Sequence, residues 1–337
     1  MKRRTALTNG LLLAALAAVP WVIKGVGWRP GYLFQIVNLL PIWVLASLSL
    51  TVIAGFGGQV SVGQAGFMAI GAYGTGLLCT LAGWPWWAGV AAGTACAMVT
   101  ALLIGIPTLR LRGPYFVMGS LAFGGIVYTI ALNWIDLTGG PGGVRGVPAF
   151  ALGSLDLGSD TALFYLLWGV AVLVMALLAG FQRTRLGKSL AAIREDELAA
   201  NAVGIPVGLV KAVAFAVSGG LAGLSGALLA HFMQYISPDS FTVSQSLLFL
   251  TMVLIGGVDR ISGAVVGSAL LLAITELLRD LANVQLLVYG LIMLAVVLFM
   301  PAGVVGEVAR LRQRKAAAVR AAGGAASQSP VASWEGN

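Results

Sequence analysis

The sequence predicts an all-α polytopic membrane protein, a bundle of about eight to ten transmembrane helices that are glycine-rich and partly broken. Three observations predict it: 59% of the 337 residues are hydrophobic, only 9% are charged, and 46 are glycine. Soluble proteins carry roughly 45–50% apolar and about 25% charged residues, so this composition excludes a soluble enzyme. Glycine at roughly twice its usual share of about 7% is typical of membrane helices that pack with their backbones close together.

Apolar stretches long enough to cross a bilayer follow one another along the chain. A hydrocarbon core of about 30 Å needs roughly 20 apolar residues in a helix. Such stretches lie near 7–23, 32–52, 63–82, 86–107, 115–134, 161–181, 210–230, 246–258, 263–282 and 285–304. The first one resembles a secretory signal, but because so many others follow it we expect an uncleaved helix. The stretch at 246–258 is short and either spans the membrane or re-enters it.

Basic residues orient these predicted helices. If the N-terminus is cytoplasmic and ten spans are crossed, most basic residues fall on the cytoplasmic side, as the positive-inside rule requires. They are Lys2, Arg3, Arg4, Arg110, Arg112, Arg183, Arg185, Lys188, Arg194, Lys211, Arg260 and those from Arg310 to Arg320. The net charge of +8 is then a topology signal and indicates no nucleic-acid partner, and we expect both termini in the cytoplasm.

The outer side is expected to hold the polar segment 135–160. Its glycine-rich part, Thr138–Pro148, has no apolar face, so we expect no helix there. A linker and a surface loop that docks an external partner are both open interpretations. At a neighbouring outer turn, Trp84, Trp86 and Trp87 are typical of anchors at the depth of the lipid headgroups.

Two glycine-rich segments lie inside apolar sequence. In the first, residues 55–76, polar side chains at bilayer depth are expensive unless they face protein or water. Close helix packing would explain them, and so would the wall of a translocation path, for which the candidates are Gln59, Ser61, Gln64 and Phe67. In the second segment, 218–226, small residues four apart form a stripe that favours helix packing.

The segment 182–209 has the densest charge and is expected in the cytoplasm. Good helix formers from Ser189 to Val203 predict one short amphipathic helix, ended by Gly204 and Pro206. The apolar stripe of this helix must be buried against another surface. Anionic lipid headgroups would repel the run Glu195-Asp196-Glu197, so we expect that a protein partner buries the stripe. By helical spacing, the face that carries this stripe holds Leu190, Ile193, Glu197 and Ala200.

Nucleotide, metal and cofactor sites are not indicated. The tripeptide Gly187-Lys188-Ser189 ends like a phosphate-binding P-loop, but Gln182 occupies the position of the required upstream glycine. Cys79 and Cys96 have no metal or redox spacing, and the single His231 cannot build a zinc site or a catalytic triad. We therefore expect no catalytic residue, no metal and no cofactor.

Taken together, the motifs resemble a known family, the permeases of branched-chain amino acid ABC transporters of the LivM type (the LivH/LivM family). The segments that carry the resemblance are Gly57–Phe67, Gly71–Tyr73, Arg110–Phe116, Leu121–Phe123, Thr138–Gly140, Arg194–Ile205, Tyr235–Pro238 and Ile255–Gly257. They stand in the family's order between about residues 32 and 304. The family usually has histidine where Gln64 stands and often asparagine where Ser49 stands. Both replacements keep hydrogen-bonding groups, so we expect the helix packing to be preserved.

The resemblance implies an importer in which this chain is one of two permease subunits and is not itself an enzyme. A second, LivH-like permease, two cytoplasmic ATPases and an extracytoplasmic solute-binding protein would complete it in a bacterial inner membrane. A permease domain would then cover 32–306. An N-terminal segment 1–31, basic and holding the first transmembrane helix, would precede it, and a cytoplasmic tail 307–337, first basic and then disordered, would follow. The loop 182–209 would dock an ATPase, through Arg194, Glu195, Asp196, Glu197, Ala200 and Gly204.

Other functions remain open at this level. The same scaffold resembles importers of urea, short amides and other small acids. A secondary transporter would need ionisable groups inside the membrane, and the deeper candidate is Glu276, which has Arg279 and Asp280 within one turn. A membrane-embedded enzyme would need convergent catalytic groups, which the sequence does not offer.

Overall fold

The computed structural model describes residues 18–21, 23–25, 30–108, 113–152, 155–156, 158–279, 282–300, 303–307 and 310, and almost all of them are helical. The α-helices are α2 (Pro30–Leu50), α3 (Gln64–Leu81), α4 (Trp86–Thr108), α5 (Pro114–Asn133), α6 (Ile135–Thr138), α7 (Asp160–Phe181), α8 (Arg185–Glu195), α9 (Glu197–Ala202), α10 (Val207–Met233), α11 (Val243–Gly256), α12 (Ile261–Leu277) and α13 (Ala282–Phe299). A π-helical turn η1 (Thr51–Phe56), two 3₁₀ turns, η2 (Gly140–Gly142) and η3 (Pro238–Phe241), and four two-residue strands complete the fold. The all-α class is confirmed.

Five of the described helices are long and apolar enough to cross a membrane: Gly31–Phe56, Trp86–Pro107, Pro114–Asn133, Asp160–Phe181 and Val207–Met233. Helices α11 and α12 make a broken pair that bends by 117°, the geometry of a broken span or a re-entrant loop. Expected spans 63–82 and 285–304 are the shorter helices α3 and α13. Most of the expected span 7–23, the motif residues Arg110 and Arg112, Asp280 and nearly all of the segment 307–337 lie outside the described residues. The described part of that span, 18–21 and 23, is helical.

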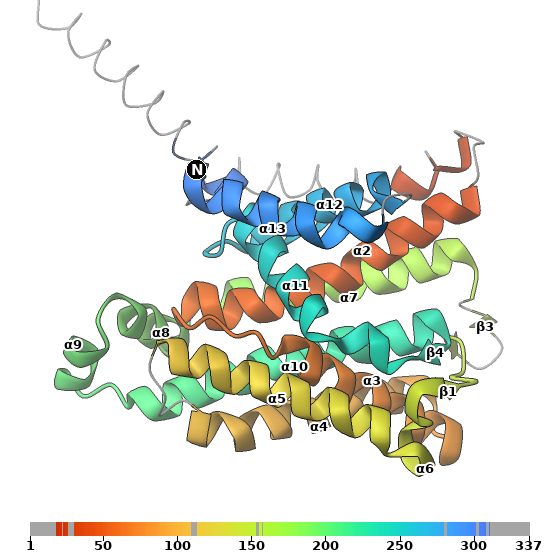
Figure 1. Ribbon diagram of the computed structural model, residues 1–337, viewed down its shortest axis with the longest axis horizontal. Helices are drawn as coiled ribbons and strands as arrows, with labels where there is room; N and C mark the ends of the chain where they lie inside the picture. Colours follow the sequence, from red (N-terminus) through yellow and green to blue (C-terminus); the bar gives the residue numbers. More distant parts are fainter. Residues whose placement is uncertain are drawn as a thin grey trace, which may run out of the picture.

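Helix α10 lies at the centre of the bundle, against α2, α3 and α4 (Figure 1). Its small residues are placed where neighbouring backbones come closest. A Cβ atom added at Gly219 or Gly223 would collide with an alanine of α4, and one at Gly226 would collide with the Met68 carbonyl of α3. The stripe predicted for 218–226 is therefore confirmed as a packing surface.

One end of the bundle carries the segments that the sequence assigns to the outside (Figure 1). Strand β1 (Val144–Arg145) pairs antiparallel with β4 (Tyr235–Ile236), and β2 (Ala151–Leu152) pairs with β3 (Leu155–Asp156). His231 Nδ1 donates to the Pro148 carbonyl at 2.7 Å, and Phe150 is buried beside it. The described part of this segment is thus fastened to the bundle, which a free linker would not be.

One expectation about this outer end is wrong. Thr138–Pro148 is not free of helix, because Thr138 ends α6 and residues 140–142 form the turn η2; the Thr138 hydroxyl donates to the Ala131 carbonyl at 2.7 Å and holds this bend. Trp86 is half-buried, and its Nε1 donates to the Ala151 carbonyl at 2.7 Å; its role as a headgroup anchor stays a prediction. Trp84 and Trp87 are exposed, as headgroup anchors would be.

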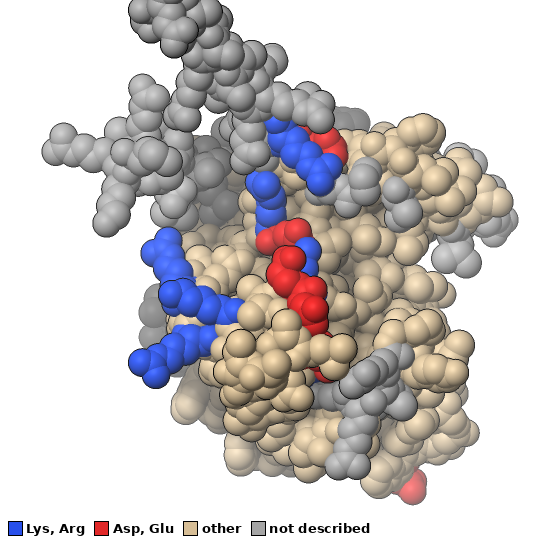
Figure 2. Space-filling view, turned by 90° about the vertical axis from the view of Figure 1, so that its left-hand side faces the viewer, with Lys and Arg blue, Asp and Glu red and all other residues tan. Residues whose placement is uncertain are grey.

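The opposite end of the bundle carries α8 and α9 (Figure 1). Arg194 of α8, Arg260 of the α11–α12 turn and Arg310 line one cavity there, so three predicted cytoplasmic segments meet. Figure 2 faces this end and shows acidic side chains in a column, with basic side chains beside it. The described segments are thus sorted between the two ends as the charge pattern predicts.

Candidate functional site

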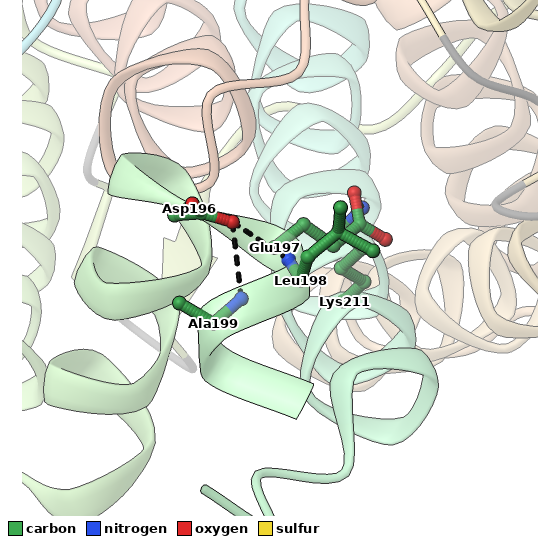
Figure 3. A network of polar contacts seen from close by, with 5 residues as sticks. All are labelled: Asp196, Glu197, Leu198, Ala199 and Lys211. Carbon is green, nitrogen blue, oxygen red and sulfur yellow. Dashed lines mark hydrogen bonds and ion pairs between the residues drawn. The ribbon is translucent and has the colours of Figure 1, made fainter. Parts of the chain in front are cut away.

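The loop between α7 and α10 forms two short helices instead of one. Helix α8 begins at Arg185, where Thr184 caps it by accepting a hydrogen bond from the Gly187 amide at 3.2 Å. The helix ends at Glu195 because Asp196 is extended and caps α9, accepting from the Leu198 and Ala199 amides at 2.8 and 3.0 Å (Figure 3). The prediction of one continuous helix over Ser189–Val203 is therefore wrong. Its predicted end is correct, since α9 stops at Ala202, just before Gly204.

The apolar stripe of this loop is covered by the chain itself. Leu190, Ile193 and Ala200 are each less than 5% exposed and belong to the main hydrophobic core, with Leu190 packed beside Gly57. The expectation that a partner covers this stripe is wrong, because the cytoplasmic end of the bundle offers an apolar surface that the sequence does not reveal. The residues that face outward are different ones: Glu195 and Gly204 are exposed, Leu198 is 71% exposed and Val203 is 77% exposed.

An ion pair ties α9 to the first turns of α10. Glu197 Oε2 lies 2.7 Å from Lys211 Nζ, and the Lys211 side chain is only 7% exposed (Figure 3). A buried ammonium group is strongly disfavoured without a partner. Glu197 therefore turns inward to neutralise Lys211, and its carboxylate is only partly available to a second protein.

A second tie runs from the end of α8 to two other segments. Arg194 Nη1 lies 2.6 Å from Asp259 Oδ1 in the α11–α12 turn and donates to the Gly55 carbonyl of η1. The aliphatic stem of Arg194 packs over Gly58, whose φ of +69° favours glycine. Sequence reasoning missed Lys211, Asp259 and Gly55 as members of this site, since each is distant in sequence from its partner.

Two cavities flank Arg194. The first has a volume of about 270 Å³ and is lined by Gly57, Gly58, Gln59, Gly113, Ile193, Arg194, Glu197 and Lys211. The second, of about 430 Å³, lies between Arg194, Gly58, the turn 257–260, Gly306 and Arg310. Within the described part of the chain, the buried Oε1 of Gln59 has no hydrogen-bond partner. The site is thus a polar, hollowed surface at which the glycine-rich turn 57–59 meets the loop.

The other three path candidates lie deeper in the bundle. Ser61, Gln64 and Phe67 are each at most 1% exposed. Gln64 Nε2 donates to the Ser218 hydroxyl at 3.0 Å, and that hydroxyl donates to the Ser49 carbonyl at 2.7 Å. The Phe67 ring lies between those of Phe123 and Phe215, with centroid distances of 4.5 and 5.5 Å. In this conformation the three residues pack against protein, and Gln59 is the candidate that lines the 270 Å³ cavity.

Replacing Gln64 by leucine is expected to lower the free energy of unfolding by about 1–2 kcal/mol, because it removes the hydrogen bond to Ser218 and packs an apolar group against buried hydroxyls. Thermal unfolding of the purified protein in detergent measures this. Gln64→Glu is a poorer choice, since it would bury a charge. An unchanged unfolding temperature for Gln64→Leu would show that the hydrogen bond contributes nothing net.

Comparison with known proteins places the chain in a family. Residues 32–299 match the family model of the permease component of branched-chain amino acid transport systems. The chain is 31% identical over 292 residues to the high-affinity branched-chain amino acid transport permease LivM of Escherichia coli, covering 80% of this chain and 69% of the relative. It is 30% identical to LivH of Salmonella typhimurium over 52% of this chain and 59% of that one. It is also 28% identical to the L-arabinose transport permease AraH of Escherichia coli, over 63% of this chain and 66% of that relative.

No solved structure matches the chain. The family match, residues 32–299, covers nearly all of the bundle from α2 to α13, including the α8–α9 loop and the 270 Å³ cavity beside Arg194. Of the 430 Å³ cavity it covers all the lining residues except Gly306 and Arg310. With several helices able to cross a membrane, this makes the chain a multi-pass membrane component of a transport system rather than an enzyme. The chain belongs to the permease family of branched-chain amino acid transport systems.

Proposed function

We propose that this chain is one of two permease subunits of an ATP-driven importer that carries branched-chain amino acids across a bacterial inner membrane. The other members would be a LivH-like permease, two cytoplasmic ATPases and an extracytoplasmic solute-binding protein. The names of its relatives support the solute, since both LivM and LivH are branched-chain amino acid permeases. The observation that carries the ATP-driven part is the α8–α9 loop, which projects from one end of the bundle and is tied back to it by two ion pairs.

We assign the ATPase contact to the outward side of this loop. Of the residues proposed for docking, Glu195, Asp196 and Gly204 are exposed, while Arg194, Glu197 and Ala200 take part in contacts to the bundle. Leu198, at 71% exposure between them, adds an apolar contact of the kind that protein interfaces bury. An ATPase would thus contact Glu195, Leu198 and Gly204, and Asp196 would hold α8 and α9 at their angle to each other.

The double change Glu195→Lys with Leu198→Asp tests this assignment. We expect co-purification of the ATPases and solute uptake to be lost, because the charge and the polarity of the contact are both reversed, while the permease still reaches the membrane. The matched control is Asp136→Lys with Leu137→Asp, the same changes at two exposed residues of the opposite end. Normal co-purification and uptake in the loop variant would refute the assignment.

We assign the C-terminal segment to the cytoplasmic side and Gln59 to the path from the cavities that their side chains line. Arg310 lines a cavity with Arg194, so the segment after α13 begins at the proposed cytoplasmic end. Gln59 lines the 270 Å³ cavity at this end, and we assign it to the inner mouth of the path. Ser61, Gln64 and Phe67 would form the packed wall behind it and move with α3 when the path opens.

The contacts of Glu276 argue against an ion-coupled carrier. Its carboxylate accepts a hydrogen bond from Tyr32, lies 3.7 Å from Arg279 and is 37% exposed. It is thus already partnered near the outer end of α12. Uptake that persists after the proton and sodium gradients are collapsed, and stops when ATP is depleted, is the expected result.

The solute itself is best identified through the solute-binding protein that the proposed importer would include. A binding assay with leucine, isoleucine and valine should give saturable binding. Saturation by urea, a short amide or a sugar instead would assign the system to another solute on the same scaffold, as the arabinose permease among the relatives illustrates.

A further inference from the structure

We propose that Arg194 is a positioning residue that joins the α8–α9 loop to the α11–α12 turn, so that a displacement of the loop moves this turn. The inference rests on the proposed ATP-driven function, and it changes the role of Arg194 from an ATPase contact to an internal link. It would make α11 and α12 the first membrane helices to respond to the ATPase.

The guanidinium group of Arg194 contacts two segments at once. It pairs with Asp259 of the α11–α12 turn at 2.6 Å and donates to the Gly55 carbonyl near the end of η1. Carbonyls at a helix C-terminus lack intrahelical partners and carry partial negative charge, so a cation is well placed there. Both of these contacts of the Arg194 guanidinium are made with the bundle itself.

Around Arg194, three segments meet almost backbone to backbone: η1, the α11–α12 turn and the segment at Gly303. A Cβ atom at Gly55 would collide with the Val258 carbonyl, so η1 and the α11–α12 turn are in direct contact. Gly257 has a φ of +111°, which favours glycine, and Gly303 packs against the Gly256–Gly257 backbone. With no side chain between them, these segments cannot easily slide past one another, so they would move together.

The α11–α12 turn is the place where a push would change the bundle. The helices bend by 117° across residues 257–260, so a small rotation of the turn swings both. The turn also closes one side of the 430 Å³ cavity beside Arg194, which leaves space into which it can move. Hinges of this kind absorb large backbone changes at a few residues.

The exposure of the ion pair separates a coupling role from a stabilising one. The side chains of Arg194 and Asp259 are 36% and 57% exposed. Exposed ion pairs add little to folding stability because solvent screens them. Breaking this pair should therefore leave the folded permease intact while weakening the link between loop and turn.

A charge exchange in the full complex tests the proposal. Arg194→Glu and Asp259→Arg are each expected to lower uptake at least tenfold, while the ATPases co-purify and still hydrolyse ATP. The double variant R194E/D259R restores an ion pair of reversed polarity, so its uptake should recover at least threefold over either single variant. Arg310→Glu is the matched control, since Arg310 lines the same cavity but pairs with Glu307 within its own segment, and it should keep uptake near the original level.

The failure of this proposal is distinguishable from failure of the proposed function. If Arg194→Glu loses the ATPases, Arg194 is a docking residue and the internal link is refuted, although ATP-driven import stands. If the single variants keep normal uptake, or if the exchange brings no recovery, the link is refuted as well. If the unaltered complex takes up solute without ATP, the proposed function fails and the link with it.

Discussion

Replacing Gly71 by alanine is expected to destroy the packing at the centre of the bundle. The added Cβ would collide with the backbone of Gly223, where α3 crosses α10. A backbone cannot rotate away as the end of a side chain can, so the two helices must separate. Overpacking a tight core costs typically 1–3 kcal/mol, and because this contact is with backbone we expect about 3 kcal/mol or more. Thermal unfolding in detergent and the yield of monodisperse protein measure the loss.

The matched control for this change is Gly125→Ala in α5. A Cβ there has no heavy atom within 4 Å, so the substitution adds a methyl group to open space. Alanine is a better helix former than glycine by about 1 kcal/mol, so this variant should be as stable as the original protein or slightly more so. Equal stability of the two variants would show that α3 and α10 do not cross as closely as described.

Replacing Glu197 by alanine is expected to have the second largest effect on stability. It leaves the Lys211 ammonium group, on a side chain that is 7% exposed, without its partner. Removing one member of a fully buried pair costs about 3–5 kcal/mol, and because the Glu197 side chain is 40% exposed we expect about 2 kcal/mol. The midpoint of thermal unfolding is the measurement.

A double variant shows whether the unpaired charge causes this loss. In Glu197→Ala with Lys211→Met, the buried charge is removed and the aliphatic stem is retained, so most of the lost stability should return. Replacing both members of a buried pair by apolar groups is often neutral. If the double variant is as unstable as the single one, packing of Glu197 and not the charge of Lys211 holds α9 in place.

The α8–α9 loop shows how far local pattern carries and where it fails. Helix-forming residues and the terminating Gly204 correctly predict helix in this region and its end. The break at Asp196 was missed, although an aspartate whose side chain can accept from the next two amides is a recognised helix start. The same aspartate inside a run of helix formers reads equally well as a solvent-exposed helical residue, and only the packing of Leu190 and Ala200 against the bundle decides between the two.

The path candidates stay a prediction, but the structure separates their environments in a way that the sequence could not. Polar residues in apolar sequence indicate only that a protein or water surface must receive them, which is true of a pore wall and of a packed interface alike. Gln64 donates a hydrogen bond to Ser218, 154 residues away, and Phe67 packs against the rings of Phe123 and Phe215. Gln59, at the glycine-rich turn, keeps an unpartnered carbonyl oxygen beside a cavity. Sequence spacing within one segment contains no information that separates these two environments.

The sequence by itself determined the membrane class, the succession of helices, the sorting of basic segments to one end and the packing stripe of α10, because these depend on composition and on short-range periodicity. Only the tertiary structure decided what covers the α8–α9 stripe, that Lys211 is neutralised by Glu197, and that Arg194 reaches Asp259, 65 positions further along the chain. These contacts join segments that are far apart in the sequence, and their partners are chosen by how the helices pack and not by the pattern within any one of them.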